Sequence, residues 1–102
     1  MEEPFDQRTV RGYILAILNG PGMTVFSWRA RRELVENDMT SADAVNVLRG
    51  GTLSKGARTP VGWRYRAETR RMGAELSFRG HERSSSAAPN ELVIESAWRN
   101  TR

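Results

Sequence analysis

Three arginines in the stretch 61–79 have the type and spacing needed to hold a phosphate. Arg64 and Arg66 alternate with apolar residues, and Arg79 does so in the run that follows. Residues two apart in a β-strand point to one face, so we expect these guanidinium groups on the solvated side of a sheet. A guanidinium group binds two phosphate oxygens at once and stabilises charge that develops on a reacting phosphate. The pattern favours a face that contacts nucleic acid, RNA in particular.

Two residues near these arginines could transfer protons. Glu75 alternates onto the face of Arg79, and across a hairpin it would approach Arg64 or Arg66. A carboxylate among arginines stays ionised, which suits a base, but the same arrangement could be a salt bridge that only neutralises its neighbours. His81 follows the strand and is the side chain best suited to proton transfer near neutrality, although a lone loop histidine is usually a surface residue.

The two strands of a hairpin position these residues. The opposite side of each strand is apolar, as in an antiparallel sheet with one face on a core and one in water. A further strand is predicted over residues 91–98, with Leu92, Ile94 and Trp98 on one face. We expect Trp98 in the core or as a cap on the sheet end rather than stacked on bases. In the hairpin, the apolar face is expected to hold Val61, Trp63, Tyr65, Ala67, Met72, Ala74, Leu76 and Phe78.

Helices are predicted before the hairpin, each preceded by a residue that can cap its N-terminus. The second is expected to turn Ala30 and Leu34 inward, with Trp28 or Arg31 as further candidates. Residues 23–26 form a short strand or a connector, and residues 53–58 are expected to begin the sheet. The caps and ranges are Asp6 with about 7–18, Ser27 with about 28–37, and Thr40 with the residues up to Gly50.

Helices followed by strands predict an α+β fold, with N-terminal helices packed on one face of a twisted antiparallel sheet. The 102 residues suit a single domain, with a helical half of about 6–50 and a sheet half of about 52–99. Residues 1–51 carry six arginines and seven acidic residues, whereas residues 52–102 carry ten cations and five glutamates. The excess of positive charge therefore belongs to the sheet half, which favours an anionic partner.

Composition excludes several other classes of protein. The chain has no cysteine, which rules out disulfides and thiolate metal sites, and its single histidine disfavours a histidine-based metal centre. We expect neither a metal nor a cofactor. No apolar run approaches the roughly 20 residues that a membrane span needs, so no membrane partner is expected. The acidic N-terminus lacks a signal-peptide pattern, and a cytoplasmic location is expected.

Several fragments together resemble a known family. They are TVFSWRA at 24–30, MTSADAVNVLRGG at 39–51, GWRYR at 62–66, and ELV with SAWR within 91–99. In order and spacing they are similar to a widespread bacterial domain-of-unknown-function family related to the RelE and MqsR toxins, which are the mRNA interferases of toxin–antitoxin systems. The resemblance covers about residues 9–99. The individual motifs are weak, and their order carries the likeness.

The resemblance implies a RelE-like fold whose basic sheet face binds and cleaves mRNA, including mRNA on the ribosome, without a metal. It also implies a cognate antitoxin that covers this face or its edge. In such cleavage the 2′-OH attacks the adjacent phosphate, so a base, a charge stabiliser and an acid are needed. The candidates for these roles are Arg64, Arg66, Arg79, Glu75 and His81. The candidates for further RNA contacts are Lys55, Arg58, Arg99 and Tyr65, the last only if a bulge turns it outward.

One position departs from the family pattern. Relatives often carry Ser-x-His-Ala at the start of the second helix, and Arg29 stands here in place of the histidine. That departure leaves a second reading open, a non-catalytic relative that binds a protein or a nucleic acid. A third reading is a helix-turn-helix over residues 27–50 that binds DNA, but Asp43 and the scarcity of cations suit a recognition helix poorly.

Overall fold

The structure is a computed structural model that describes residues 4–60, 62–79 and 88–100. Val61 and His81, together with most of the segment that follows the hairpin, lie outside the described residues. None of the helices described is long and apolar enough to cross a membrane. In chain order the elements are α1 (Gln7–Asn19), β1 (Met23–Phe26), α2 (Trp28–Glu36), α3 (Ser41–Gly50), β2 (Thr52–Thr59), β3 (Gly62–Glu68), β4 (Met72–Arg79) and β5 (Glu91–Arg99).

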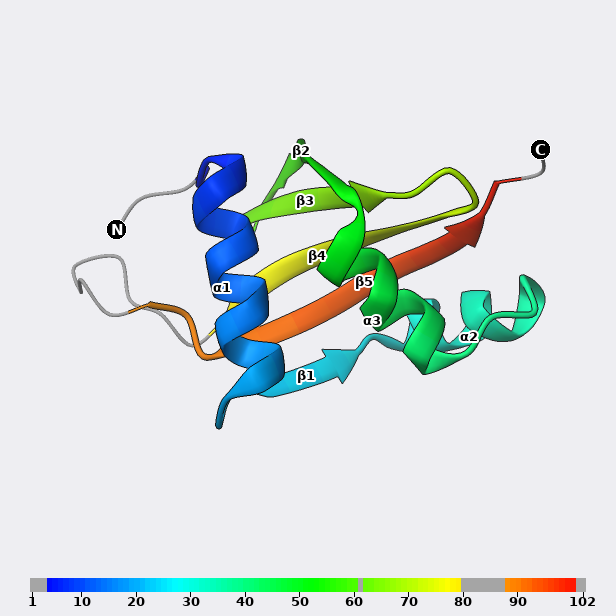
Figure 1. The fold of residues 1–102 in the computed structure, drawn as a ribbon. Coiled ribbons are helices and arrows are strands. Elements are labelled where there is room, and N and C mark those ends of the chain that lie inside the picture. Colours follow the sequence, from blue (N-terminus) through cyan, green and yellow to red (C-terminus); the bar gives the residue numbers. More distant parts are fainter. Residues whose placement is uncertain (1–3, 61, 80–87, 101–102) are drawn as a thin grey trace.

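The five strands form one mixed sheet in the order β1-β5-β4-β3-β2 (Figure 1). The pairs from β2 to β5 are antiparallel, as expected for consecutive hairpin strands. In contrast, β1 pairs with β5 in parallel, with Met23 opposite Glu91 and Phe26 opposite Ile94. The prediction of an α+β fold is confirmed, but the prediction of a purely antiparallel sheet is wrong. The chain runs through two helices and three further strands before β5 reaches β1, which permits a parallel pairing.

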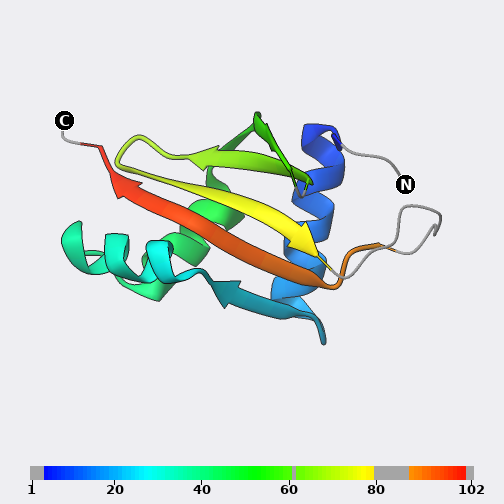
Figure 2. The same ribbon diagram turned by 180° about the vertical axis from the view of Figure 1, so that it is seen from behind.

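Helices α1 and α3 cover one face of the sheet, while α2 lies along β5 (Figures 1 and 2). The core between these layers takes the apolar stripes of both helices and the inward residues of four strands. Its largest fully buried side chains are Tyr65, Ile14, Leu48, Leu76, Leu92, Ile94 and Val10. We call the opposite side of the sheet, which α1 and α3 leave uncovered, the outer face.

The helices begin at the predicted caps. The Asp6 carboxylate accepts a hydrogen bond from the Thr9 amide at 2.7 Å, and the Ser27 hydroxyl accepts one from Ala30 at 3.0 Å. Before α3, Thr40 and Asp43 form a reciprocal capping box. These caps satisfy amide groups that the first helical turn leaves without partners, which is why short polar residues mark the helix starts.

Two of the residues proposed to point inward from α2 are exposed instead. Ala30 and Leu34 are buried as expected, but Trp28 is 71% exposed and Arg31 is also exposed. Because α2 contacts the sheet mainly along β5, a narrow stripe is enough to cover its buried side.

A β-bulge in β5 reverses the direction of one important side chain. Glu75 pairs with Ser96, but the next residue of β4, Leu76, pairs with Ile94, so Glu95 is the extra residue. After the bulge the alternation shifts by one position, which turns Ala97 to the core and Trp98 to the outer face. The expectation that Trp98 lies in the core is therefore wrong, because strict alternation across residues 91–98 assumes a strand without a bulge.

Arg11 joins the two helices that cover the core. From α1 its guanidinium group donates to the Leu48 carbonyl at 2.7 Å and to the carbonyls of Arg49 and Gly51. These carbonyls belong to the end of α3, where the last turn has no amide partners of its own. A cation at this end also faces the negative pole of the helix dipole. One side chain thus caps α3 and fixes it against α1.

Replacing Arg11 with Ala should destabilise the protein by about 1–3 kcal/mol, because it leaves the α3 carbonyls without their donor. Urea unfolding followed by circular dichroism measures the change. Arg8→Ala is the matched control, since Arg8 is an exposed arginine on the same helix, and we expect its effect to stay within about 0.5 kcal/mol. Equal effects of the two substitutions would contradict the role given to Arg11.

Candidate functional site

The outer face carries the three arginines that the sequence pattern placed together. In β3 the core residues Tyr65 and Ala67 alternate with Arg64 and Arg66, which therefore point outward. In β4 the same alternation turns Arg79 outward. No helix lies across these strands on this side (Figure 2). The arginines thus share one accessible surface of the sheet and are not packed beneath the N-terminal helices.

Glu75 also lies on the outer face, directly across the hairpin from Arg66. The pairing agrees with the expectation that Glu75 would approach Arg64 or Arg66 across the hairpin. Directly opposed side chains of an antiparallel pair have their Cβ atoms about 4.5–5.5 Å apart, so Glu75 and Arg66 start side by side, while the Arg66 guanidinium group itself is turned toward Glu68 and Trp98. The described part of the site therefore holds a potential base beside a potential phosphate ligand.

Carboxylates alternate with the arginines across the whole face. The Arg66 Nε atom lies 3.3 Å from the Glu68 Oε1 atom, and Arg79 pairs in register with Glu91. The bulge adds Glu95, which accepts a hydrogen bond from Ser77 at 2.7 Å. The expected basic face is thus a face of mixed charge, because alternation puts the glutamates of β3, β4 and β5 on the same side as the arginines.

An aromatic ring lies among these charges. Trp98 pairs with Gly73 in the sheet, and its indole ring lies over that glycine. The guanidinium carbon of Arg66 lies 4.7 Å from the centroid of the same ring, a cation–π contact. The sequence offered one sign of this arrangement. Gly73 interrupts an otherwise regular strand, and a glycine at such a position marks the close approach of another group.

Two predicted RNA contacts lie on the other side of the sheet. Lys55 pairs with the core residue Tyr65, and Arg58 pairs with Trp63, which packs against the core. Opposed residues share a face, so both cations lie on the side of the helices, at the β2 edge. The Lys55 ammonium is 5.4 Å from the Trp63 ring centroid, and Lys55 also lines a cavity of about 360 Å³ beside the start of α1. Neither of these predicted RNA contacts therefore lies on the outer face with Arg64 and Arg66.

Two more predicted RNA contacts have structural roles. Tyr65 is 1% exposed, and its hydroxyl accepts a hydrogen bond from the Phe5 amide at 3.0 Å, so no RNA can reach it. The bulges lie in β2 and β5, and none turns this residue outward. Arg99 donates to the carbonyls of Asn37 and Asp38 at 3.0 and 2.8 Å, which ties its guanidinium group to the turn between α2 and α3. Tyr65 is therefore excluded as an RNA contact, whereas Arg99 is exposed and remains a predicted contact.

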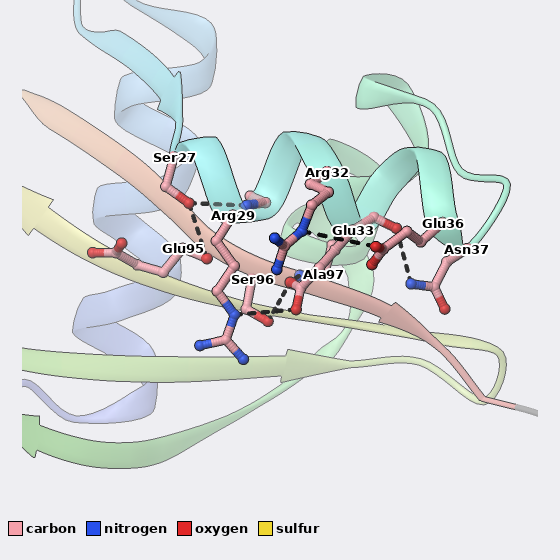
Figure 3. A network of polar contacts seen from close by, with 10 residues as sticks. Ser27, Arg29, Arg32, Glu33, Glu36, Asn37, Glu95, Ser96 and Ala97 are labelled. Carbon is pink, nitrogen blue, oxygen red and sulfur yellow. Dashed lines mark hydrogen bonds and ion pairs between the residues drawn. The ribbon is translucent and has the colours of Figure 1, made fainter.

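Helix α2 borders the outer face and completes the edge of β5 (Figure 3). Beyond the end of β1, the amide of Ala97 and the hydroxyl of Ser96 both donate to the Glu33 carboxylate, at 3.0 and 2.7 Å. The Arg99 amide donates to the Asn37 side chain at 3.3 Å. Side chains of α2 thus accept the hydrogen bonds that a longer β1 would have accepted.

The environment of Glu33 favours its ionised form. Burial raises the pKa of this carboxyl, but hydrogen bonds from Ser96, from the Ala97 amide and from Arg29 outweigh it, so the pKa falls below its ordinary value of 4.5. The side chain is 19% exposed, which protects these bonds from competing water. Nothing in the sequence singled out Glu33, because a glutamate in a helix is ordinarily a solvated residue.

Arg29 occupies the position where the resembling family often has histidine. It lies in the first turn of α2, and its Nε atom donates to the second oxygen of the Glu33 carboxylate at 3.1 Å. Figure 3 shows this carboxylate between Arg29 and Ser96 of β5. Arg29 therefore adds a guanidinium group at the α2 border of the outer face. It cannot act as the acid or base that a histidine supplies.

No protein-family model matches this chain, and neither a curated protein nor a solved structure matches it. Within residues 4–60, 62–79 and 88–100, no three His, Cys, Asp or Glu side chains form a group that could hold a metal ion. Among the described residues, the outer face offers guanidinium groups, carboxylates and the indole ring of Trp98.

Glu33→Gln should lower the free energy of unfolding at pH 7 by about 1 kcal/mol, because a neutral amide replaces an ionised acceptor. The folded-state pKa of Glu33 is lowered, so its contribution is complete above about pH 4.5 and is lost as the pH falls through the lower folded value. We expect the wild type to lose stability below pH 4.5 more steeply than the variant in urea unfolding at several pH values.

Glu36→Gln is the control for this measurement. Glu36 lies on the same helix and faces Arg32 at 3.7 Å, but it is largely exposed. Its variant should follow the wild-type pH profile, because exposed ion pairs contribute little. If the stability of Glu33→Gln falls with pH as steeply as that of the wild type, the contacts along the β5 edge do not depend on the charge of Glu33.

Proposed function

We propose that the outer face binds single-stranded RNA and cleaves it without a metal ion, as an endoribonuclease toxin of the RelE and MqsR type. The observation that carries the proposal is Glu75 opposite Arg66 in the hairpin, with Arg64 and Arg79 on the same face. This arrangement offers a base beside groups that hold a phosphate. The sequence resemblance, with its helices before a sheet, supports the same class of protein.

The reaction needs one bond to form at phosphorus and one to break. The 2′-oxygen attacks the adjacent phosphate, and Glu75 accepts the 2′-OH proton. Arg64 and Arg66 bind the equatorial oxygens, where negative charge increases in the transition state. The bond to the 5′-oxygen then breaks, and this oxygen takes a proton from solvent or from His81, the acid that the sequence suggests. The products are a 2′,3′-cyclic phosphate and a 5′-hydroxyl end.

The mixed charge of the face shapes how RNA would bind. A phosphate has to replace Glu68 as the partner of Arg66, and an exposed pair of this kind is readily exchanged. Glutamates between the arginines also repel phosphates that are out of register. Binding should therefore be weak for an arbitrary polyanion and sensitive to salt.

The biological setting follows from the same proposal. The protein would act on mRNA in the cytoplasm, with or without the ribosome, and a cognate antitoxin would hold it inactive. An antitoxin that covers the outer face would bury the arginines and satisfy them with its own carboxylates. We expect expression of this protein alone to arrest bacterial growth. Co-expression of the small protein encoded by an adjacent gene should then restore growth.

The double variant Arg64→Ala/Arg66→Ala should cut RNA at least about 100-fold more slowly, because it removes the groups that bind the reacting phosphate. A fluorescent RNA assay with chelator present measures the rate. Arg70→Ala/Arg71→Ala removes the same charge from the exposed turn between β3 and β4 and should keep the wild-type rate within a few fold. If both double variants slow equally, net charge and not this site supports cleavage.

Glu75→Gln separates a base from a neutralising salt bridge. If Glu75 accepts the 2′-OH proton, cleavage falls about 100-fold or more while RNA binding holds or tightens, since a negative charge is removed. The cleavage rate is measured with RNA, and the dissociation constant is measured in parallel with a 2′-deoxy analogue that cannot be cleaved. Full activity of the variant would assign Glu75 to charge balance alone.

The mixed charges also favour a second candidate, a non-catalytic module that binds a protein through the outer face. Alternating Arg and Glu side chains suit a partner with complementary charges, and Arg29 stands at the position where the resembling family often has a histidine. This candidate predicts a stable protein complex and no cleavage of RNA by the purified chain. Cleavage of RNA by the purified wild-type protein in the assay with chelator decides between the two.

A further inference from the structure

Trp98 presents an indole ring beside the arginines to which the proposed function assigns phosphate contacts. The ring lies so close to Gly73 that a Cβ atom built there would be 2.3 Å from its Cε2 and Cζ2 atoms. The backbone at Gly73 therefore supports one side of the ring. The Arg66 guanidinium group lies over the ring with its Cζ atom 4.7 Å from the centroid. The indole ring of Trp98 thus lies against the sheet, and the Arg66 side chain covers it.

An incoming ligand can displace the Arg66 guanidinium group from the Trp98 ring. Its side chain is 46% exposed, and its ion-pair partner Glu68 is 41% exposed. Exposed pairs of this kind are weak and are screened by salt. A phosphate competes with Glu68 for the same guanidinium group and binds it through two oxygens. When Arg66 turns to a phosphate, the outer side of the indole ring becomes available to another planar group.

We propose that Trp98 is the base-binding residue of the outer face. The base of a single-stranded nucleotide stacks on the indole ring, while Arg66 moves from the ring to a phosphate of the same strand. This inference rests on the proposed function and specifies which part of the RNA is recognised. Bases in a duplex are already stacked on each other, so the ligand is single-stranded. Larger rings stack more strongly, which favours purines over pyrimidines.

Trp98 fluorescence reports the contact directly. The chain has three tryptophans, so Trp28→Phe/Trp63→Phe leaves Trp98 as the single fluorophore. A short deoxyadenylate oligomer is the probe, because it lacks the 2′-OH and cannot be cleaved. We expect this oligomer to quench the fluorescence on binding. An abasic oligomer with the same number of phosphates should bind about tenfold more weakly and leave the fluorescence nearly unchanged.

Substitutions test the same contact from the protein side. Trp98→Ala should weaken binding of the deoxyadenylate oligomer about 5- to 100-fold and leave binding of the abasic oligomer unchanged. Trp98→Phe keeps a ring and should bind with intermediate affinity. Trp28→Ala is the matched control, because Trp28 is an exposed tryptophan on α2 whose ring contacts Arg32, and this variant should bind as the wild type does. If Trp98→Ala fails to fold by thermal melting, Trp98→Phe and the abasic comparison still decide.

Equal affinity for the base-bearing and abasic oligomers, or no quenching of Trp98, would overturn the inference. Its failure is distinct from failure of the proposed cleavage. If the deoxy oligomer binds through Trp98 but RNA remains intact, the nuclease proposal fails and base binding stands. If RNA is cleaved and Trp98→Ala binds and cleaves as well as the wild type, cleavage stands and base binding fails.

Discussion

The backbone edge of β5 is the constraint on which the rest of the structure depends. β1 pairs with only the first part of this strand, from Glu91 to Ile94, so the remaining amides and carbonyls need other partners. Ser27 begins the replacement by donating its amide to the Ile94 carbonyl and its hydroxyl to the Glu95 carbonyl. Glu33 and Asn37 continue it along the strand. A helix thus takes the place of a strand along this edge, and it is held there by these hydrogen bonds together with the burial of Ala30 and Leu34.

This edge also determines what the outer face contains. Because Glu33 is held by Ser96 and Ala97, α2 stays beside the strand and leaves the surfaces of β3 and β4 open. The bulge at Glu95 lies where β1 ends and α2 begins, and it turns Trp98 toward Gly73. The covered face, in contrast, is fixed by apolar burial and by the Arg11 contacts between α1 and α3.

Much of the fold could be predicted from local patterns. The helix starts follow from Asp6, Ser27 and Thr40, since capping depends on neighbours within three residues. The directions of Arg64, Arg66 and Arg79 follow from alternation in two regular strands. Tyr65 keeps the inward direction that alternation gives, and alternation from the buried Leu53 also turns Lys55 inward. Arg58 shows where local reasoning ends, because a second bulge, between Lys55 and Arg58, turns it to the inward side. Bulges depend on the partner strand, which a single strand's pattern does not contain.

The lack of space above Gly73 links two positions that lie 25 residues apart in the sequence. Any side chain at position 73 would occupy the volume that the indole ring of residue 98 fills, so position 73 is restricted to glycine as long as the tryptophan is present. A descendant of this protein could lose the ring first and then acquire a larger residue on β4, but the reverse order would pass through a clash. The pair therefore restricts the order in which mutations can accumulate on this face.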